Sequence, residues 1–526
     1  MKSRNLSLFI IFILTLDICF SKKKIPFLSN LLEPEVEEEC KDLSFTPTKE
    51  NVKLIGRFYQ NEDITWLVQS GSAIEFYAEG NSAEVILVGG NSIYNEENYR
   101  SRFGVYVDDE ILLDSTMSEL ELTVKLFKKE KKAKIKVMLL SEANNGGIGV
   151  KIININSCNE TPVKPTEKKK LSIEIIGDSI TAAYGVEGEN QYENFKTTTE
   201  NFSKSYAYLT AKKLDADYSA VCYSGHGIVS GYSTGDKNSE ALLPPEYTKI
   251  SKNSDYPGKW DFKNNQHDII VINLGTNDLN YVTKNPEERN DEFIQEYADF
   301  LNIVRENNPK SYILCTVGIM GGGDEIYPLI EKAVKLVGDD KISSYKSSVQ
   351  NMNDGLGSDW HPSLKTQTYN SYVLSDKICN VLGIESDQVG LDVASDSVYD
   401  VYQNEENGAM MSFWVGYDKS FWINTVMGGK EPSDIEAKCS GIQLKKGGVY
   451  ILEFEYTSTK EGEVTVIIRG SKEYFKDSIK SGGDKIVYSK EITIKDNDEN
   501  AEIVYQLGGL DSFGFTLTNI KLTKIK

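Results

Sequence analysis

The chain contains only three histidines, His226, His267 and His361, so chemistry that needs a side-chain base near neutral pH has few candidates. His361 is notable because a carboxylate, Asp359, lies two residues before it. A carboxylate can orient an imidazole, and the imidazole can then accept a proton from a hydroxyl group. Ser179, in the sequence Gly-Asp-Ser-Ile-Thr, carries a hydroxyl that such a base can activate. Together these residue types suit attack by a serine on a carbonyl carbon.

Ser179 follows an apolar segment that we expect to be a strand. Residues 171–176 form a short, β-branched run that is uncharged except for Glu174, which is typical of a buried strand in a parallel sheet. Gly177 ends this run, and the residues after it suit the start of a helix. Ser179 would then lie at the carboxyl edge of a sheet, where open α/β folds bind ligands. The alternative is that Ser179 only caps the helix.

Two further blocks can supply donors for the oxyanion that such an attack creates. Asn277, within Asn-Leu-Gly-Thr-Asn-Asp, follows the most apolar strand, and its side-chain NH₂ can donate to an oxyanion. Gly225, within Ser-Gly-His-Gly, follows another strand and offers a backbone N–H, with Gly227 in the same loop as the alternative. Asn277 can instead form a turn or cap the next helix.

Strands alternate with helices throughout residues 171–390, which predicts a doubly wound α/β domain with a parallel sheet. The expected strands are residues 171–176, 218–223, 267–274 and 312–319, and the expected helices are residues 202–214, 286–306, 326–337 and 363–382. Parallel strands end at one common edge, so this fold would bring Ser179, Gly225 and Asn277 together. His361 would reach them from the loop before the last helix.

The regions on both sides of this domain have the pattern of antiparallel β-structure. Residues 40–158 and 391–526 contain short alternating or β-branched runs separated by turns, so we expect a β-sandwich in each. Residues 159–170 contain two prolines and three consecutive lysines and are expected to be a linker. Residues 22–39 form an acidic leader. The chain is therefore expected to be multidomain, with a sandwich before and after the α/β domain.

The N-terminus and the composition suggest export. Residues 1–21 place two basic residues before an apolar run, as in a secretory signal peptide, although Asp17 leaves an uncleaved anchor as the alternative. Cys40 and Cys158 bracket the first β-region and can join its ends in an oxidising compartment. The net charge of −21 argues against nucleic acid and anionic membranes as partners. We expect a secreted, extracellular protein, and a monomer.

The four blocks occur in the order found in the SGNH (GDSL-type) hydrolases, which the chain resembles over residues 171–385. They are Gly-Asp-Ser-Ile-Thr, Ser-Gly, Gly-Thr-Asn-Asp and Asp-Trp-His-Pro. The β-region in front and the longer run Gly-Asp-Ser-Ile-Thr-Ala-Ala-Tyr-Gly-Val-Glu-Gly are similar to carbohydrate esterase family 2, which includes acetyl xylan esterases. That extends the resemblance to residues 40–385 and implies a jelly-roll sandwich in front of an SGNH hydrolase domain.

The resemblance also implies a role for each matching residue. Ser179 would be the nucleophile, and His361 would be the general base and then the general acid. The oxyanion would be bound by the backbone N–H groups of Ser179 and Gly225 and by the side chain of Asn277. No metal ion or organic cofactor is implied.

One position departs from the pattern of the SGNH hydrolases. They commonly place the acid three residues before the histidine, and this chain has Ser358 there. Asp359, one residue later, is the candidate to orient His361 by the logic of a catalytic triad. The alternative is that the backbone carbonyl of Trp360 takes this role.

In the C-terminal region, the run Gly-Val-Tyr-Ile-Leu-Glu-Phe at residues 448–454 and the closing residues 515–522 resemble jelly-roll carbohydrate-binding modules. Trp414 and Trp422 can stack on sugar rings there, and Trp360 can do so beside the site, although core packing is the competing role for the C-terminal aromatics. The run Asp-Asn-Asp-Glu-Asn at residues 496–500 can hold calcium, but a solvated turn is favoured because it lacks the glycine and distal glutamate of an EF-hand.

These expectations converge on a secreted carbohydrate O-acetyl esterase that removes acetyl groups from plant cell-wall polysaccharide, such as xylan or glucomannan, through an acetyl-serine intermediate. Its partner would be the acetylated polysaccharide or oligosaccharide substrate. Two alternatives remain. SGNH hydrolases include lipases and lysophospholipases, and an α/β domain that has lost its activity would leave a polysaccharide-binding protein.

Overall fold

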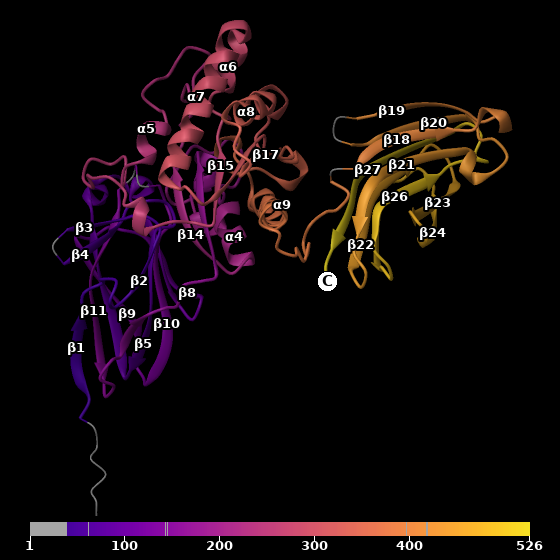
Figure 1. Ribbon diagram of the computed structural model, residues 1–526. Coiled ribbons are helices and arrows are strands. Elements are labelled where there is room, and N and C mark those ends of the chain that lie inside the picture. Colours follow the sequence, from indigo (N-terminus) through magenta and orange to yellow (C-terminus); the bar gives the residue numbers. More distant parts are fainter. Residues whose placement is uncertain (1–38, 62, 143, 145, 396, 417–418) are drawn as a thin grey trace, which may run out of the picture.

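The computed structural model describes residues 39–61, 63–142, 144, 146–395, 397–416 and 419–526. The expected signal peptide at residues 1–21, and all of the leader at residues 22–39 except its last residue, lie outside the described residues. None of the described helices is long and apolar enough to cross a membrane. Figure 1 shows a β-rich N-terminal body in indigo, a body of helices around a sheet, and a second all-β body in orange and yellow. The expected multidomain organisation is confirmed.

The N-terminal body consists of two antiparallel sheets. One has the strand order β3-β4-β11-β6-β9 with β1 beside β11, and the other has the order β12-β5-β10-β7-β8 with β2 beside β5. The strands are β1 (Lys41–Phe45), β2 (Lys53–Ile55), β3 (Phe58–Asn61), β4 (Ile64–Leu67), β5 (Ala73–Gly80), β6 (Ser82–Gly89), β7 (Arg102–Val107), β8 (Glu110–Thr116), β9 (Glu121–Phe127), β10 (Lys131–Leu139), β11 (Ile148–Ser157) and β12 (Val163–Pro165). Alternate residues of both sheets are buried in one shared apolar core, which holds the two sheets together.

The last strand of this body, β12, lies inside the segment expected to be a linker. Val163 pairs with Ala78 and Pro165 with Phe76, at the edge of the sheet. Pro165 is tolerated there because an edge strand does not need every N–H for pairing. The expected linker at residues 159–170 is therefore partly a strand of the N-terminal body.

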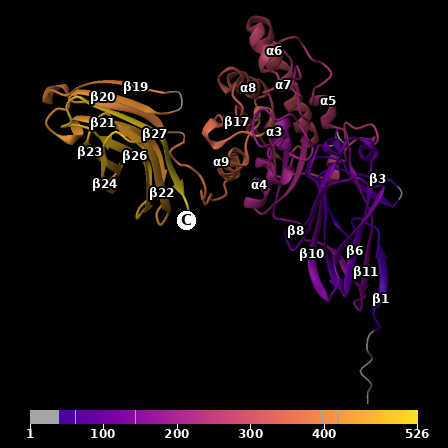
Figure 2. The ribbon, with the colours of Figure 1, turned by 180° about the vertical axis from the view of Figure 1, so that it is seen from behind.

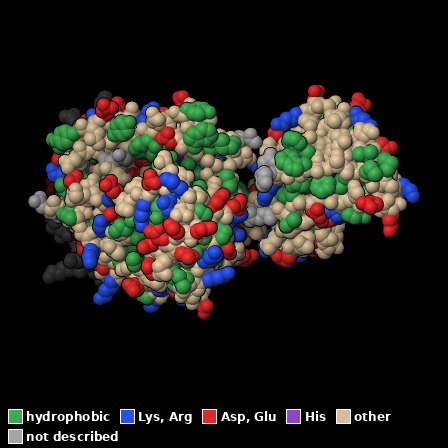
Figure 3. Space-filling view, turned by 90° about the horizontal axis from the view of Figure 1, so that it is seen from above, with side chains coloured by type: hydrophobic (Ala, Val, Ile, Leu, Met, Phe, Trp, Pro, Cys, Tyr) green, Lys and Arg blue, Asp and Glu red, His purple; other side chains and the backbone are tan. Residues whose placement is uncertain are grey.

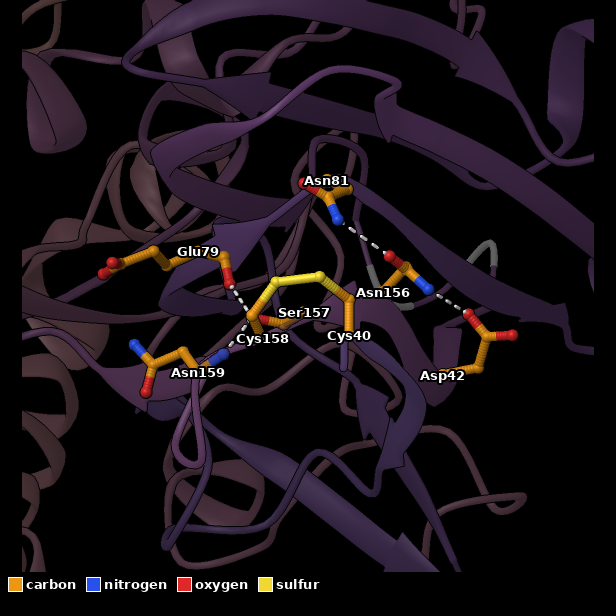
Figure 4. The surroundings of a disulfide bond; sticks show 8 residues. All are labelled: Cys40, Asp42, Glu79, Asn81, Asn156, Ser157, Cys158 and Asn159. Carbon is orange, nitrogen blue, oxygen red and sulfur yellow. Dashed lines mark hydrogen bonds between the residues drawn. A yellow bond between two sulfur atoms is a disulfide. The ribbon is translucent and has the colours of Figure 1, made fainter. Parts of the chain in front are cut away.

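Cys40 and Cys158 form a disulfide (Figure 4). The bond joins the residue before β1 to the residue after β11, and these two strands are paired side by side. Next to it, the Asn81 side-chain amide donates to Asn156 Oδ1 (3.0 Å), and the Asn156 amide donates to Asp42 Oδ1 (2.7 Å). The two ends of the N-terminal body are thus closed by a covalent bond and by polar side chains.

The central body contains a five-stranded parallel sheet with the order β14-β13-β15-β16-β17. Its strands are β13 (Leu171–Gly177), β14 (Ala216–Cys222), β15 (Ile269–Asn273), β16 (Tyr312–Val317) and β17 (Ile342–Lys346). Its helices are α3 (Ser179–Ala182), α4 (Tyr206–Lys213), α5 (Pro244–Tyr247), α6 (Leu279–Lys284), α7 (Pro286–Asn307), α8 (Gly323–Val337) and α9 (Leu364–Leu382). The strand order reverses between β13 and β15, and such a switch point is where ligands bind in these sheets.

Helices cover both faces of this sheet. Apolar residues of α7 and α8 pack with β15 and β16 in one core cluster, and those of α4 and α9 pack with β13 and β14 in another. β15, with the sequence Ile-Ile-Val-Ile-Asn, is buried along its whole length, as expected for a strand covered on both faces. The edge strand β17 was not expected, because its sequence, Ile-Ser-Ser-Tyr-Lys, lacks an apolar run.

The C-terminal body consists of two five-stranded antiparallel sheets, with the orders β18-β21-β26-β23-β24 and β19-β20-β27-β22-β25. The strands are β18 (Val398–Gln403), β19 (Met410–Val415), β20 (Phe421–Met427), β21 (Ile435–Leu444), β22 (Val449–Ser458), β23 (Gly462–Arg469), β24 (Glu473–Ser481), β25 (Ile486–Thr493), β26 (Asp498–Gln506) and β27 (Phe513–Lys524). Their inward residues form a separate apolar core. Figure 2 shows this body set to one side, whereas the N-terminal sheets pack directly beneath the α/β body.

Candidate active site

Ser179 and His361 lie within hydrogen-bond distance, with 2.8 Å between Ser179 Oγ and His361 Nε2. Ser179 is the first residue of α3, directly beyond the carboxyl end of β13, and 7% of its surface is exposed. His361 comes from the loop before α9. The two residues are far apart in sequence, yet the fold brings them together.

Asp178, not Ser179, caps the short helix α3. Its Oδ1 accepts a hydrogen bond from the backbone N–H of Ile180 at 3.0 Å. The Ser179 hydroxyl is therefore not used as a cap and is available to His361. The capping role that was the alternative for Ser179 belongs to its neighbour.

Backbone carbonyl groups hold the imidazole of His361. Nδ1 lies 3.1 Å from the carbonyl oxygen of Ser358 and 3.1 Å from that of Asp359. Carbonyl groups only accept, so Nδ1 carries the proton and Nε2 has its lone pair directed at the Ser179 hydroxyl. This is the tautomer that a general base for serine requires.

The carboxylate of Asp359 does not take the position expected for it. Its Oδ2 accepts hydrogen bonds from the Tyr184 hydroxyl (2.7 Å) and from the backbone N–H of Phe195 (3.1 Å). The alternative orienter differs as well, because the carbonyl of Trp360 accepts from the Gln350 side chain at 2.9 Å. The imidazole is therefore oriented by the backbone carbonyl groups of Ser358 and Asp359, and not by the Asp359 carboxylate or the Trp360 carbonyl.

An unusual backbone turn explains why carbonyl groups, and not the Asp359 carboxylate, face the imidazole of His361. Asp359 has φ 48° and Trp360 has φ 65°, both in the left-handed region. Asp is among the residues that tolerate this region, but a bulky Trp there is strained, at a cost on the order of 1–3 kcal/mol. The turn directs the carbonyl groups of Ser358 and Asp359 toward the imidazole and the Asp359 side chain away from it.

The ring of Tyr184 covers one face of the imidazole. The ring centroids of Tyr184 and His361 are 4.1 Å apart with 25° between the planes, and Phe195 stacks on Tyr184 at 4.5 Å. Burial lowers the pKa of His361 to about 4, partly opposed by the two carbonyl groups and by the charge of Asp359. The imidazole is therefore neutral at physiological pH. Sequence patterns did not single out Tyr184, because its stacking on His361 and its hydrogen bond to Asp359 join segments that are distant in sequence.

Gly225 lies on the open side of the loop that follows β14. Its φ is +74°, and a Cβ at this position would meet no atom within 4 Å. The N–H of Gly227 donates to the carbonyl of Ala241 (3.1 Å), and a Cβ on Gly227 would strike the Ser230 carbonyl. Of the two glycines, Gly225 is the one whose N–H has no acceptor among the described residues.

Asn277 reaches the same edge but is engaged by the protein. Its Nδ2 donates to the carbonyl of His226 (2.9 Å) and lies 3.2 Å from Asp178 Oδ2. Its expected role as an oxyanion donor therefore requires one of these bonds to be exchanged. Burial raises the pKa of Asp178 to about 7, which weakens this carboxyl group as a competing acceptor near neutral pH.

The neighbouring Asp278 organises the loop from behind. Its carboxylate accepts from the backbone N–H groups of Ile228 (3.0 Å), Val229 (2.8 Å) and Ser230 (2.9 Å). Burial raises its pKa to about 6 even though these three donors stabilise the charged form. Of these two adjacent residues, Asn277 therefore faces the site, whereas Asp278 anchors the loop.

The other two histidines do not contact Ser179. The Nδ1–H of His226 donates to the carbonyl of Ser224 (2.9 Å), and its Nε2 accepts from Lys252 Nζ (2.7 Å). His267, before β15, has both ring nitrogens buried without a partner among the described residues. His361 is thus the histidine that the structure brings to the serine.

The expected sugar-binding aromatics divide into two places. Trp360 is 46% exposed beside His361, and the ring of Tyr192 meets it edge-on at 5.7 Å. Trp414 and Trp422 lie on the C-terminal body, outside this site.

Within the described part of the chain, no group of three or more His, Cys, Asp or Glu residues is arranged to hold a metal ion. In the run considered for calcium, Asp498 accepts hydrogen bonds from Ser471 and from the Tyr474 hydroxyl (2.7 Å). It therefore acts as a support for a turn.

Comparisons with known proteins agree with this geometry. Residues 175–338 match the GDSL-like Lipase/Acylhydrolase family, and this range includes Ser179, Gly225 and Asn277. Cellulase/esterase CelE of Acetivibrio thermocellus is 30% identical over 353 residues, which are 65% of this chain and 41% of that protein. An acetylxylan esterase / glucomannan deacetylase of Cellvibrio japonicus is 24% identical over 323 residues, 59% of this chain and 84% of that protein. The chain thus spans less than half of the length of CelE.

Among solved structures, a family two carbohydrate esterase from Clostridium thermocellum in complex with cellohexaose superposes with a TM-score of 0.56. It is 28% identical, and the match covers 63% of this chain and 99% of that one. The matched share of this chain corresponds in size to the N-terminal and α/β bodies together. This chain therefore contains a GDSL-like lipase/acylhydrolase domain and is similar in sequence and structure to family 2 carbohydrate esterases.

Proposed function

We propose that this protein is a secreted carbohydrate O-acetyl esterase that deacetylates plant cell-wall polysaccharide such as xylan or glucomannan. The observation that carries the proposal is the 2.8 Å contact between Ser179 Oγ and the lone-pair nitrogen of His361, whose other nitrogen is held by backbone carbonyl groups. The similarity to carbohydrate esterases supports the choice of substrate class. The exposed ring of Trp360 at the same site supports a sugar as the alcohol part of the ester.

The chemistry proceeds in two halves. His361 Nε2 takes the proton of Ser179 as Oγ attacks the acetyl carbonyl carbon, and the resulting oxyanion accepts from the N–H groups of Ser179 and Gly225 and from Asn277. When the tetrahedral species collapses, the bond to the sugar oxygen breaks and His361 returns the proton to that oxygen. Water, deprotonated by His361, then attacks the acetyl-serine, and acetate leaves with Ser179 restored.

Replacing the nucleophile tests the proposal directly. The Ser179→Ala variant should lose acetate release from acetylated xylan and hydrolysis of an aryl acetate alike, by about 10⁴-fold or more, as for the loss of a triad member. Circular dichroism should show an unchanged fold, because the Ser179 hydroxyl does not cap α3. Substantial turnover by this variant on either substrate would contradict the assignment.

Two competing functions have their own measurements. A lipase or lysophospholipase would hydrolyse long-acyl aryl esters faster than aryl acetate, whereas the deacetylase should prefer acetyl. A purely polysaccharide-binding protein would not react with a fluorophosphonate, because only an activated serine is labelled quickly.

Secretion is supported by the disulfide between Cys40 and Cys158, since disulfides persist in oxidising compartments. The test is to express the full chain in a secreting host and determine the N-terminal sequence of the product in the medium. We expect it to begin near residue 22. Retention of residues 1–21 on a cell-bound product would favour the uncleaved anchor instead.

We propose a second function, carbohydrate binding, for the C-terminal body. A groove of about 420 Å³ crosses the sheet that contains β19 and β20. Trp414 and Trp422 are opposite each other on these strands, are 51% and 53% exposed, and meet at 5.1 Å in an edge-to-face arrangement. Thr516 is opposite Trp422 on β27, so a polar group continues the row. Figure 3 shows hydrophobic side chains exposed on the upper side of this body.

An aromatic pair bordered by hydroxyl groups suits a sugar ring, which presents an apolar face and polar edges. The Trp422→Ala variant should migrate faster than the parent protein through a native gel that contains soluble polysaccharide. Val487→Ala, on the exposed edge strand β25 of the same sheet, is the matched control and should be retarded like the parent. Equal migration of Trp422→Ala and the parent would exclude this groove as a sugar site.

A further inference from the structure

The loop that carries Gly225 is held by a residue of the N-terminal body. Glu142, in the segment after β10, is buried, and its Oε2 accepts from the backbone N–H of Ser224 at 2.7 Å. Its Oε1 accepts from the Ser224 hydroxyl. Two bonds to one carboxylate fix the residue that directly precedes Gly225. Because the peptide between Ser224 and Gly225 carries the Gly225 N–H, the direction of that N–H depends on Glu142 together with His226, whose Nδ1–H donates to the carbonyl of the same peptide at 2.9 Å.

A second carboxyl group, Glu200, lies behind Glu142 and is fully buried. The backbone N–H of Glu142 donates to Glu200 Oε2 at 3.0 Å, so the two buried carboxyl groups are neighbours. Two ionised carboxylates at such close range in a buried place repel each other, which favours one proton being kept by the pair. Glu200 Oε1 has no partner among the described residues.

The neighbouring charges do not neutralise the pair. Arg102, on β7, forms ion pairs with Glu187 (2.7 Å) and Asp114 (2.8 Å), and it reaches Glu200 only through that residue's backbone carbonyl (3.1 Å). Lys252 Nζ is likewise bound to the ring of His226. Neither Arg102 nor Lys252 therefore forms an ion pair with Glu142 or Glu200.

The distribution of donors decides which carboxyl group keeps the proton. Burial raises the pKa of Glu200 well above its usual value, and the neighbouring charge of Glu142 raises it further. Burial also raises the pKa of Glu142, but the two bonds from Ser224 and the more distant charge of Lys252 act in the opposite direction. Glu142 is thus the charged acceptor, and Glu200 is the proton holder.

We propose that Glu142 and Glu200 form a positioning pair, joined by one shared proton, that fixes the Ser224–Gly225 peptide for oxyanion binding. The inference rests on the proposed esterase function, and it makes the N-terminal body a working part of the active site. Neither glutamate touches the substrate. When the shared proton is lost at alkaline pH, two buried negative charges face each other, the pair separates, and the loop loses its support.

The first test removes the acceptor. With aryl acetate as substrate, Glu142→Ala should lower kcat about 10-fold to 100-fold, less than the 10²–10³-fold typical of losing one oxyanion donor outright. KM should stay within about threefold, because ground-state binding does not use the oxyanion donors.

The second test replaces Glu200, the carboxyl group that holds the proton, with an amide that cannot lose one. Glu200→Gln removes the group that can lose the proton, so the alkaline decline of kcat that we expect in the parent should move to higher pH by at least about one unit. Glu174→Gln is the matched control, because Glu174 is a buried carboxylate at the same boundary between bodies but bonds to Arg57 and Tyr247. It should lower the melting temperature and leave the pH profile in place.

The outcomes distinguish this inference from the proposed function. Hydrolysis of aryl acetate without release of acetate from polysaccharide would overturn the substrate class and leave the test of the pair intact. If no ester is hydrolysed, the pH-dependent rate of fluorophosphonate labelling of Ser179 replaces kcat, since the phosphonyl oxygen uses the same donors. The positioning pair is overturned if Glu142→Ala stays within twofold of the parent, or if Glu174→Gln shifts the pH profile as much as Glu200→Gln does.

Discussion

The two all-β bodies are attached to the central α/β body in opposite ways. The N-terminal body sends buried polar side chains across its boundary. The Arg57 guanidinium bonds to Glu174 (3.2 Å) and to backbone carbonyl groups, and the Gln69 amide donates to the Tyr223 hydroxyl (2.6 Å). The C-terminal body is joined through the segment after α9, where the exposed Asp387 carboxylate binds Lys213 of the α/β body at 2.9 Å and the Asp387 backbone carbonyl accepts from Lys524 on β27.

This difference indicates which parts act as one unit. Breaking a buried ion pair leaves a charge without a partner, so the N-terminal and α/β bodies should unfold together. An exposed pair contributes only about 0–1 kcal/mol, which does not couple two cores. The C-terminal body has its own core, separate from the other two. We therefore interpret the first two bodies as one structural unit and the third as an appended module.

The largest expected effect comes from the buried ion pair at the N-terminal boundary. Arg57→Met leaves Glu174 buried and unpaired, which should cost about 3–5 kcal/mol of unfolding free energy. Differential scanning calorimetry of the full chain should show the transition of the first two bodies moving down as one, with the C-terminal transition unmoved.

The matched variant lies in the C-terminal body. Arg469 pairs with Glu436 at 2.8 Å and with Glu502 at 2.7 Å but is about one-third exposed. Arg469→Met should lower only the C-terminal transition, and by less. If Arg57→Met split the first transition into two, the N-terminal and α/β bodies would be independent and the comparison would fail.

A smaller effect is expected when the pH is lowered, and it should depend on the active site and not on the C-terminal body. Activity should fall as the pH drops through about 4, because protonated His361 cannot accept the proton of Ser179. The same lowered pKa makes the folded state bind fewer protons than the unfolded state, so stability should decrease as the pH falls below about 6.5 toward 4. The profile of kcat for aryl acetate in the parent and in Trp422→Ala should coincide. An acidic limb near pH 6.5 would show that the imidazole is solvated.

The smallest effect is expected at Asp359. In Asp359→Asn the two carbonyl groups still hold His361, so kcat should stay within about threefold of the parent, far from the about 10⁴-fold loss seen when a triad carboxylate is replaced. Removal of the Asp359 charge should move the acidic limb slightly lower, because that charge raises the pKa of His361. Steady-state kinetics across pH measures both effects, and a loss of a hundredfold or more would restore the carboxylate as the orienter.

Sequence reasoning located the parts of the site that depend on short motifs at strand ends. Ser179 and the blocks around Gly225 and Asn277 each follow an apolar strand, so the parallel topology alone brings them to one edge. The orienter of His361 was misplaced because spacing does not reveal which atom of Asp359 faces the ring. The orientation of Asp359 depends on the left-handed backbone at Asp359 and Trp360, which no local sequence pattern predicts.

Other features could not be predicted from the sequence because they depend on packing between distant segments. Glu142 lies in a different body from Ser224, and nothing near it in sequence marks it as a partner. The strands β12 and β17 were not expected, since one contains a proline and the other is largely polar. Both are edge strands, where pairing on one side replaces the apolar pattern of a buried strand.

The disulfide at the base of the N-terminal body has a mechanical consequence. Cys40 and Cys158 are separated by 118 positions in sequence, yet the bond between them lets tension pass from one to the other without loading the strands between them. A pull on the leader would bypass strands β1 to β11 and reach the chain just before β12. Glu142, which lies within the protected loop, would keep its hold on Ser224 under such a load.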